Sequence, residues 1–91
     1  MYTIKTTNRF EKSLKLCIRR NYDLNLLKEI IDILQKGESL PANNKAHKLT
    51  GKYSDCWECH IKPNWLLVWK INEDELVLLL MDTGTHSDLF G

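Results

Sequence analysis

The sequence lacks long hydrophobic runs: its longest apolar stretch, residues 76–81, is far shorter than the roughly 20 residues of a membrane-spanning helix. Repeats and low-complexity segments are also absent. The first residues, Met1–Lys5, lack the basic and then apolar layout of a secretory signal, so we expect a cytoplasmic protein with no membrane partner. A chain of 91 residues can enclose one modest hydrophobic core, and we expect a single domain over residues 1–91.

Cysteine is scarce, with three in the chain, and we expect no disulfide framework. The segment Cys56–His60 reads Cys-Trp-Glu-Cys-His, the attachment motif of c-type haem, but haem attachment requires export. The segment also lies where alternation predicts a strand, which would send Cys56 and Cys59 to opposite faces. The same separation argues against a zinc site that adds His47 and His60 to the two cysteines. We therefore expect three reduced thiols, with neither cofactor nor metal.

Positive charge is missing from the end of the chain, because all 13 lysines and arginines lie within residues 1–70 while 5 of the 12 acidic residues follow Ile71. The first 70 residues therefore hold 13 basic against 7 acidic side chains, a net charge of +6. A basic body of this kind suits a phosphate-rich partner. Lysine-rich, solvated helix faces would explain the charge equally well.

Apolar spacing predicts a short strand and two helices in the first part of the chain. Residues 2–5 alternate weakly, as in a strand, and Asn8 with Glu11 resembles a capping box that begins a helix. Asp23 can cap a second helix after a short turn. Residues at helical spacing give each helix one apolar face: Phe10, Leu14, Cys17 and Ile18 on the first, and Leu27, Ile30, Ile31 and Leu34 on the second.

Three strands should follow a polar loop that spans residues 38–52. β-Branched and aromatic residues mark the strands, which turn residues separate: Asp55–Ile61, Trp65–Ile71 and Glu75–Met81. The short turns favour an antiparallel meander. We therefore predict an α+β fold, in which a short N-terminal strand and a two-helix hairpin pack on a small, mainly antiparallel sheet.

Reactive side chains concentrate in the last 45 residues, which hold all three histidines: His47, His60 and His86. Strand alternation places Glu58 and His60 on one face and Cys59 on the other. Converging imidazoles and a carboxylate suit proton transfer near neutral pH, although each histidine alone could be a surface residue or the partner of a polar group. The tail that carries His86 and Phe90 is either a reactive pair or a cap on the core.

Three segments carry a family resemblance: His47–Gly51, Glu58–Val68 and Thr83–Phe90. In this order and spacing, and with the helical pair, they resemble the RelE-type toxins of bacterial type II toxin–antitoxin systems, specifically the YafQ branch. The resemblance implies a RelE-like, microbial-ribonuclease-like α+β fold and a ribosome-dependent mRNA endoribonuclease, or mRNA interferase. It also implies a metal-free reaction without a cofactor, in which the 2′-hydroxyl attacks its own phosphate with acid and base assistance.

The resemblance also implies partners and site residues. The partners would be a cognate antitoxin protein, the ribosome and messenger RNA, with operator DNA reached only through the antitoxin complex. By position, the family's functional residues match three histidines and two aromatics: His47, His60, His86, Trp65 and Phe90.

Roles follow for these residues and their neighbours. We expect His86 to protonate the leaving oxygen and Phe90 to stack on a base. We expect His60, helped by Glu58, to act as the base, while His47 orients the phosphate. The RNA backbone would be held by cations: Lys45, Lys48, Lys52, Lys62 and the pair Arg19–Arg20.

Three positions depart from the family pattern. Asn64 stands where the family usually has an aspartate proposed as the general base, Asp82 stands near the tail where an arginine is usual, and Trp57 replaces a basic residue. A carboxylate near a developing phosphate charge is repulsive. Asn64 and Asp82 support an alternative hypothesis, a catalytically weak homologue that binds an antitoxin or the ribosome. A general RNA-binding module, whose histidines only contact phosphate, is a second alternative.

Overall fold

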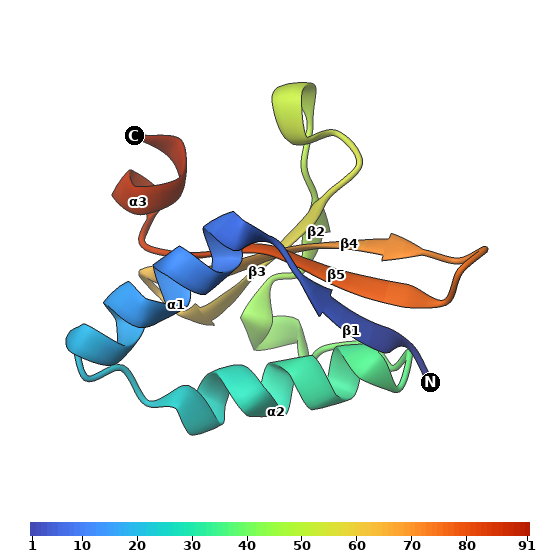
Figure 1. Cartoon of the computed structure of the whole chain (residues 1–91), viewed down its shortest axis with the longest axis horizontal. Helices are drawn as coiled ribbons and strands as arrows, with labels where there is room; N and C mark the ends of the chain where they lie inside the picture. Colours follow the sequence, from blue (N-terminus) through green and yellow to red (C-terminus); the bar gives the residue numbers. More distant parts are fainter.

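Five strands form one mixed sheet, and helices lie on both of its faces (Figure 1). The computed structural model describes all 91 residues. In chain order the elements are β1 (Thr3–Thr6), α1 (Asn8–Arg19), α2 (Leu24–Gln35), η1 (Ala42–Asn44), β2 (His47–Lys48), η2 (Gly51–Tyr53), β3 (Trp57–Lys62), β4 (Trp65–Asn72), β5 (Val77–Gly84) and α3 (His86–Phe90), where η marks a 3₁₀ turn. The strand order is β1-β5-β4-β3-β2, and only β1 and β5 are parallel. The predicted α+β fold with a mainly antiparallel sheet is confirmed.

Side-chain caps explain where the two long helices begin. The Thr7 hydroxyl accepts a hydrogen bond from the backbone N–H of Phe10, so Thr7 caps α1 instead of the predicted Asn8. The prediction for α2 is confirmed, because the Asp23 carboxylate accepts from the backbone N–H of Asn25. None of the helices has both the length and the apolar composition needed to cross a membrane.

The sheet divides the hydrophobic core into two clusters. The larger cluster lies between the sheet and the two long helices and contains Phe10, Cys17, Leu27, Ile30, Leu34, Cys59, Trp65, Leu67, Trp69, Leu78 and Leu80. The smaller cluster lies on the opposite face and contains Cys56, Leu66, Val68 and Leu89. Ile18, predicted for the buried helix face, is instead 51% exposed, because it lies with Lys12, Lys15 and Arg19 on the outer side of α1. The smaller cluster holds α3 against the sheet by burying Leu89.

Turns and short elements account for the differences from the predicted strands. β3 begins two residues later than predicted, because the N–H of Cys56 still bonds to the C=O of Tyr53 in a turn. β5 also begins two residues later, because the N–H of Glu75 bonds to the Asn72 side chain in the β4–β5 turn. β2 and α3 were not predicted, since a two-residue strand and a five-residue helix are too short to show a period.

The three cysteines are free and buried. Cys56 belongs to the smaller cluster and Cys59 to the larger one, so their thiols lie on opposite faces of the sheet, as alternation predicted. The two cysteines of the Cys-Trp-Glu-Cys-His segment therefore cannot ligate one ion or attach one haem. Burial raises the pKa of Cys59 to about 12 and also raises the pKa of Cys17 and of Cys56.

Candidate active site

Strand pairing places His47 and His60 on one face of the sheet, and α3 brings His86 beside His60. His47 on β2 lies directly opposite Glu58 on β3, and His60 follows two residues further along the same face. His47 and His60 are thus diagonal neighbours on adjacent strands, and the Cα atoms of such pairs lie about 7–8 Å apart. At the start of α3, the ring of His86 lies 5.7 Å from the ring of His60, centroid to centroid. One site therefore receives imidazoles from β2, β3 and α3.

Asn64, in the turn between β3 and β4, orients the ring of His86. The Asn64 side-chain oxygen lies 3.2 Å from Nδ1 of His86 and 3.4 Å from its backbone nitrogen. An amide oxygen only accepts hydrogen bonds, so Nδ1 carries a proton and Nε2 is the nitrogen left to exchange one. Asn64 cannot take a proton as an aspartate would, but it selects which nitrogen of His86 is available.

Glu58 contacts His47 and not His60, the partner predicted for it. Glu58 Oε1 lies 3.5 Å from His47 Nε2, while His47 Nδ1 donates to the C=O of Lys45 at 2.9 Å. The contact between Nε2 and the carboxylate is an ion pair only when the imidazole carries both protons. Glu58 is 5% exposed, and its Oε2 is buried without a hydrogen-bond partner. The Glu58 carboxylate therefore lies buried beside the half-exposed ring of His47.

A capping box and a bidentate ion pair hold α3 in place. The Thr85 hydroxyl accepts from the backbone N–H of Asp88, and the Asp88 carboxylate accepts from the backbone N–H of Thr85. The same carboxylate accepts from both terminal nitrogens of Arg20, at 2.6 and 3.2 Å. The Arg20 guanidinium, together with the N–H of Thr85, holds the pKa of Asp88 well below its usual range. Arg20, predicted to hold RNA, instead positions the helix that carries His86.

The Arg20–Asp88 pair should give the protein an acid-sensitive contribution to stability. A carboxyl whose pKa is lowered by folding stabilises the fold fully above its unfolded pKa of about 3.9, and this stability is lost as the pH falls through the lower folded pKa. We expect the difference in unfolding free energy between wild type and Arg20→Gln to be constant from about pH 7 to pH 5 and to shrink below about pH 4. Urea unfolding of both proteins at a series of pH values from about 7 to below 4 measures this difference.

The matched control for this prediction is Lys28→Gln. Lys28 and Asp32 form an exposed pair on α2, 2.9 Å apart, which contributes little in water. Its removal should change stability slightly and almost equally at every pH. A difference for Arg20→Gln that persists undiminished in acid would contradict the ionic role given to Asp88.

The predicted backbone-binding cations are divided between different surfaces. Lys45 and Lys62 line an open groove of about 340 Å³ beside His60. Lys48 follows His47 on β2 and so faces the opposite side of the sheet, where it lines another groove. Arg19 lies on the outer side of α1. Only the first two of these four cations lie beside the histidines.

The two predicted aromatic residues are placed differently. Phe90 is 48% exposed and meets the ring of Tyr53 edge-on, with centroids 6.0 Å apart. Lys52, also predicted to bind RNA, lies near this pair, 5.8 Å from the centroid of the Tyr53 ring. Trp65 is 3% exposed, and its indole N–H donates to the Thr83 hydroxyl within the larger core cluster. Trp65 is therefore mostly a core residue, and the small part of it that is exposed lines a groove with Lys62 and Asn64; the substrate contact expected for it stays a prediction.

Asp82, which we expected to repel a phosphate, is neutralised inside the protein. Arg9 Nε donates to one of its carboxylate oxygens at 2.7 Å, while the Ser13 hydroxyl and the Thr83 backbone N–H donate to the other. Asp82 is 8% exposed, whereas the Arg9 side chain is 60% exposed. The charge presented to solvent at this point is therefore positive. No sequence signal indicated Arg9, which is 73 residues away along the chain.

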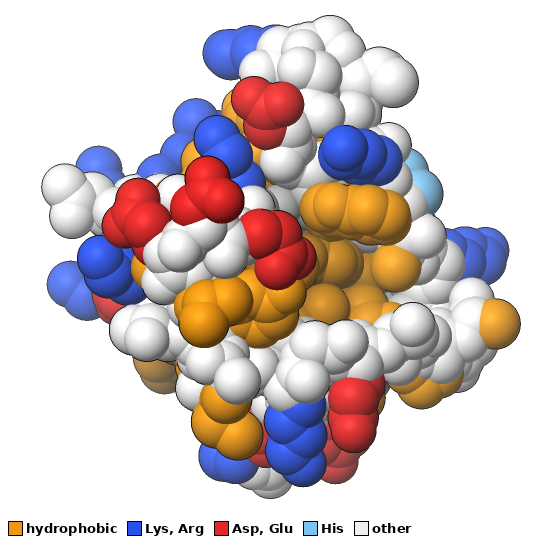
Figure 2. Space-filling view, turned by 90° about the vertical axis from the view of Figure 1, so that its right-hand side faces the viewer, with side chains coloured by type: hydrophobic (Ala, Val, Ile, Leu, Met, Phe, Trp, Pro, Cys, Tyr) orange, Lys and Arg blue, Asp and Glu red, His pale blue; other side chains and the backbone are white.

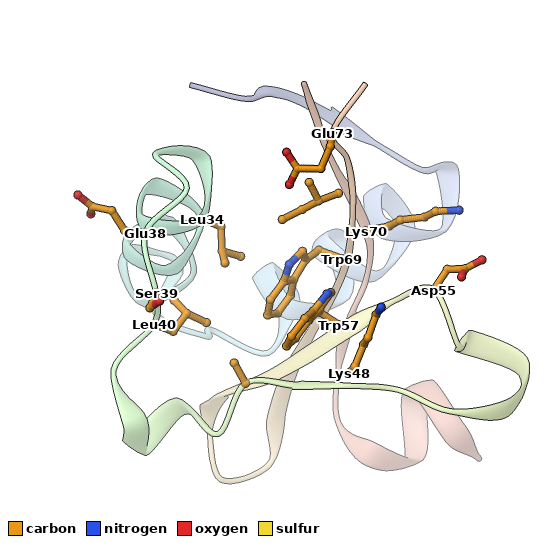
Figure 3. Close-up of a pocket in the computed structure, with 12 residues that line it drawn as sticks. Leu34, Glu38, Ser39, Leu40, Lys48, Asp55, Trp57, Trp69, Lys70 and Glu73 are labelled. Atoms are coloured by element: carbon orange, nitrogen blue, oxygen red, sulfur yellow. The ribbon is translucent and has the colours of Figure 1, made fainter. Parts of the chain in front are cut away.

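The largest groove of the molecule lies away from the histidines. It measures about 760 Å³ and separates the end of α2 from the sheet. Figure 2 shows hydrophobic side chains gathered around a hollow at this end of the molecule. In Figure 3, Trp57 and Trp69 lie side by side and face Leu34 and Leu40 across the gap. No histidine lines this groove, so its size does not mark the reactive site.

Known proteins resemble this chain over almost its whole length. The family described as "Bacterial toxin of type II toxin-antitoxin system, YafQ" matches residues 2–91. The "mRNA interferase toxin YafQ" of Escherichia coli K12 is 34% identical over 89 residues, which are 97% of this chain and 95% of that protein. A metal-bound toxin from Helicobacter pylori has a TM-score of 0.93 at 40% identity and covers 99% of this chain and 100% of its own. The E. coli DinJ–YafQ toxin–antitoxin complex contains a chain with a TM-score of 0.89 at 33% identity, with coverage of 99% and 98%.

Proposed function

Because the chain belongs to the YafQ family of bacterial type II toxins, we propose that it is a ribosome-dependent mRNA endoribonuclease that a cognate antitoxin silences. The E. coli relative is named an mRNA interferase toxin, and E. coli YafQ forms a complex with DinJ. The observation that carries the proposal is the pair of His60 and His86, with rings 5.7 Å apart and His86 oriented by Asn64. Two imidazoles so placed can serve one phosphate as base and acid.

The proposed reaction is a transesterification within the message. The ribose 2′-oxygen attacks the adjacent phosphorus while its proton passes to His60. The bond from phosphorus to the 5′-oxygen breaks, and His86 Nε2 gives its proton to that leaving oxygen. The products are a 2′,3′-cyclic phosphate end and a 5′-hydroxyl end, so the step consumes no water and needs no redox partner. An acid and a base placed in this way each contribute about 10²–10⁴-fold to the rate.

Positive charge around the histidines supports the same reaction. His47, next to Glu58, shares a sheet face with His60, and Lys45 and Lys62 line the groove beside His60. The attacked phosphate gains negative charge in the transition state. Fixed cations aimed at a developing charge are usually the largest single contribution to catalysis. These groups would supply the charge that the family pattern draws from an arginine at the position of Asp82.

The alternative is a catalytically weak homologue that binds an antitoxin or the ribosome without cutting. Its support came from Asn64 and Asp82, and both have places in a working site: Asn64 orients His86, and Arg9 neutralises Asp82. The H. pylori relative is described as metal-bound. In this chain no three His, Cys, Asp or Glu side chains converge to hold a metal ion, so we assign no step to one.

The proposal also concerns where the protein acts and with which partners. We place a single toxin domain, residues 1–91, in the cytoplasm with the ribosomes. Operator DNA would be contacted only through the antitoxin complex. The net charge of +6 on residues 1–70 suits RNA as well as an acidic antitoxin segment.

Cleavage assays with purified protein test the proposed function. The protein should cut a message bound in the ribosomal decoding site and leave the same naked RNA intact, and prior mixing with the cognate antitoxin should prevent the cut. Equal cleavage of naked and ribosome-bound RNA would remove the ribosome from the proposal. Tight antitoxin binding with no cleavage of either RNA would establish the binding alternative.

A further inference from the structure

The outer face of α1 carries positive charge that the proposed reaction does not use. Lys12, Lys15 and Arg19 are three and four residues apart, so they lie together on the side of the helix that faces away from the core. With the half-exposed Ile18 they line an open groove of about 520 Å³. All three cations are exposed, and none of them forms an ion pair within the protein. Their charge is therefore available to a partner.

Positive charge distinguishes α1 from α2, the other helix on the same face of the sheet. α1 holds four basic side chains and one acidic side chain, Glu11, whose carboxylate accepts a hydrogen bond from the Thr6 hydroxyl. α2 holds one basic and two acidic side chains, and its lysine pairs with an aspartate in the next turn. Both helices pack on the larger core cluster. Solvation alone would serve both helices equally, so the difference indicates a ligand for α1.

The outer face of α1 and the histidines lie on opposite sides of the sheet. Cys17 of α1 and Cys59 of β3 both belong to the larger core cluster, beneath the helices. His60, the next residue of β3, points to the other side, where its ring lies beside that of His86. A strand of RNA held by these two histidines would have to pass around the sheet to reach α1. The helix is therefore placed to meet a different molecule.

The side chains of this face suit a nucleic acid better than a protein. Interfaces between proteins depend on buried aromatic and aliphatic anchors and are depleted of lysine. The groove offers one apolar side chain, Ile18, among three cations. At a rise of about 1.5 Å per residue, the three cations form a row about 10 Å long. Lysine and arginine side chains in such a row can follow a phosphate backbone.

We propose that the outer face of α1 docks on a double-helical segment of the ribosome's own RNA, while the histidine face receives the message. Base-paired RNA presents a regular array of phosphates and 2′-hydroxyls, which proteins bind by shape and charge without reading the sequence. Docking holds the histidines near the bound message and so raises its effective concentration at the site. The inference rests on the proposed function and names the surface through which the ribosome dependence arises.

Matched pairs of charge deletions test this docking on programmed ribosomes. Lys12→Gln with Lys15→Gln removes two charges from the row, while Lys28→Gln with Lys36→Gln removes two exposed charges from α2 and its C-terminal cap. Glutamine forms helices about as well as lysine, so both pairs should fold. The slope of log affinity against log salt concentration should become shallower by about 2 for the first pair, one unit for each lost phosphate contact, and stay at the wild-type value for the second. Equal changes in both pairs would show a general charge effect and overturn the proposal.

Single-turnover cleavage separates docking from the chemical step. The variant with Lys12→Gln and Lys15→Gln should need a higher concentration of programmed ribosomes to reach half of its maximal rate. Its rate at saturating ribosomes should equal that of wild type, because neither lysine touches the reacting groups. A lower rate at saturation with unchanged ribosome affinity would place α1 in the chemistry and reject a docking role.

A short, blunt-ended RNA duplex tests the same face without ribosomes or cleavage. In NMR titrations of wild type, the largest shifts should occur at the amide signals of the groove residues: Lys12, Lys15, Ile18 and Arg19. Absence of binding, or shifts confined to residues around the histidines, would reject the proposal. So would a variant with Lys12→Gln and Lys15→Gln that binds duplex and ribosomes normally but binds the cognate antitoxin weakly, since the face would then belong to the antitoxin.

These outcomes keep the inference separate from the proposed function. If wild type binds the duplex and the ribosome through α1 but cuts no message, the endoribonuclease proposal fails and the docking face stands. If wild type cuts ribosome-bound message and both pairs of charge deletions bind ribosomes alike, the docking face is rejected and the endoribonuclease stands.

Discussion

Replacing His86 with alanine is expected to lower the rate of cleavage of ribosome-bound message by about 10²–10⁴-fold, the usual contribution of a general acid. In the variant, the leaving 5′-oxygen departs without receiving a proton from the protein. His86 is exposed and its side chain bonds only to Asn64, so the free energy of unfolding should change little. Single-turnover cleavage on programmed ribosomes, with the toxin in excess, measures the chemical step.

Ser87→Ala is the control for this experiment. Ser87 is the next exposed residue of α3, and its hydroxyl takes part in no hydrogen bond. The Ser87→Ala variant should cut at the wild-type rate and unfold at the wild-type urea concentration. Retention of more than about a tenth of the wild-type rate by His86→Ala would remove this residue as the general acid and give the role to His47 or His60.

A methyl group at position 84 is expected to detach α3 from the sheet. Gly84 has a φ of +150°, and a Cβ there would lie 2.8 Å from Asp88 Oδ2 and 3.2 Å from Leu89 Cδ1. Moving Asp88 breaks its contact with Arg20, and moving Leu89 opens the smaller core cluster. Backbone strain and overpacking each cost about 1–3 kcal/mol, so Gly84→Ala should lose about 2 kcal/mol or more of unfolding free energy. The cleavage rate of Gly84→Ala should fall as well, because α3 carries His86.

Gly51→Ala separates the backbone contribution from the clash. Gly51 also has a positive φ, +69°, but a Cβ there would meet no atom within 4 Å. Its cost should therefore be that of the left-handed conformation alone, about 1 kcal/mol, with α3 undisturbed. Urea unfolding of both variants, with NMR signals of α3 as a local probe, makes the comparison. Equal losses for the two variants, or α3 signals unchanged in Gly84→Ala, would show that the close approach of α3 to Gly84 contributes nothing.

Much of the fold could be predicted because the long elements show a clear period. α1 and α2 each repeat their apolar residues over 12 residues, and β3 to β5 alternate or run apolar over 6 to 8. β2 and α3 carry no such signal, since pairing with Glu58 and docking on the sheet define them. The available sign of α3 was Thr85 followed three residues later by Asp88, a capping box.

The family and the histidines could also be predicted, whereas their supporting contacts could not. The resemblance to YafQ toxins is confirmed over residues 2–91, and strand alternation correctly separated His60 from Cys59. The five residues that begin β4 are all buried, since both faces of that strand are covered, so no alternation revealed that Trp65 points into the core. The partners of Glu58 and Asp82 depend on strand register and on α1, which a local pattern does not encode.

The enclosure of all three cysteines has a consequence for the reactivity of their thiols. Oxidants and electrophiles attack thiolates, yet Cys17, Cys56 and Cys59 are each at most 5% exposed, and burial raises the pKa of each thiol. All three cysteines are free, so none forms a disulfide. In the folded protein the three thiols are therefore poor targets for oxidants and electrophiles.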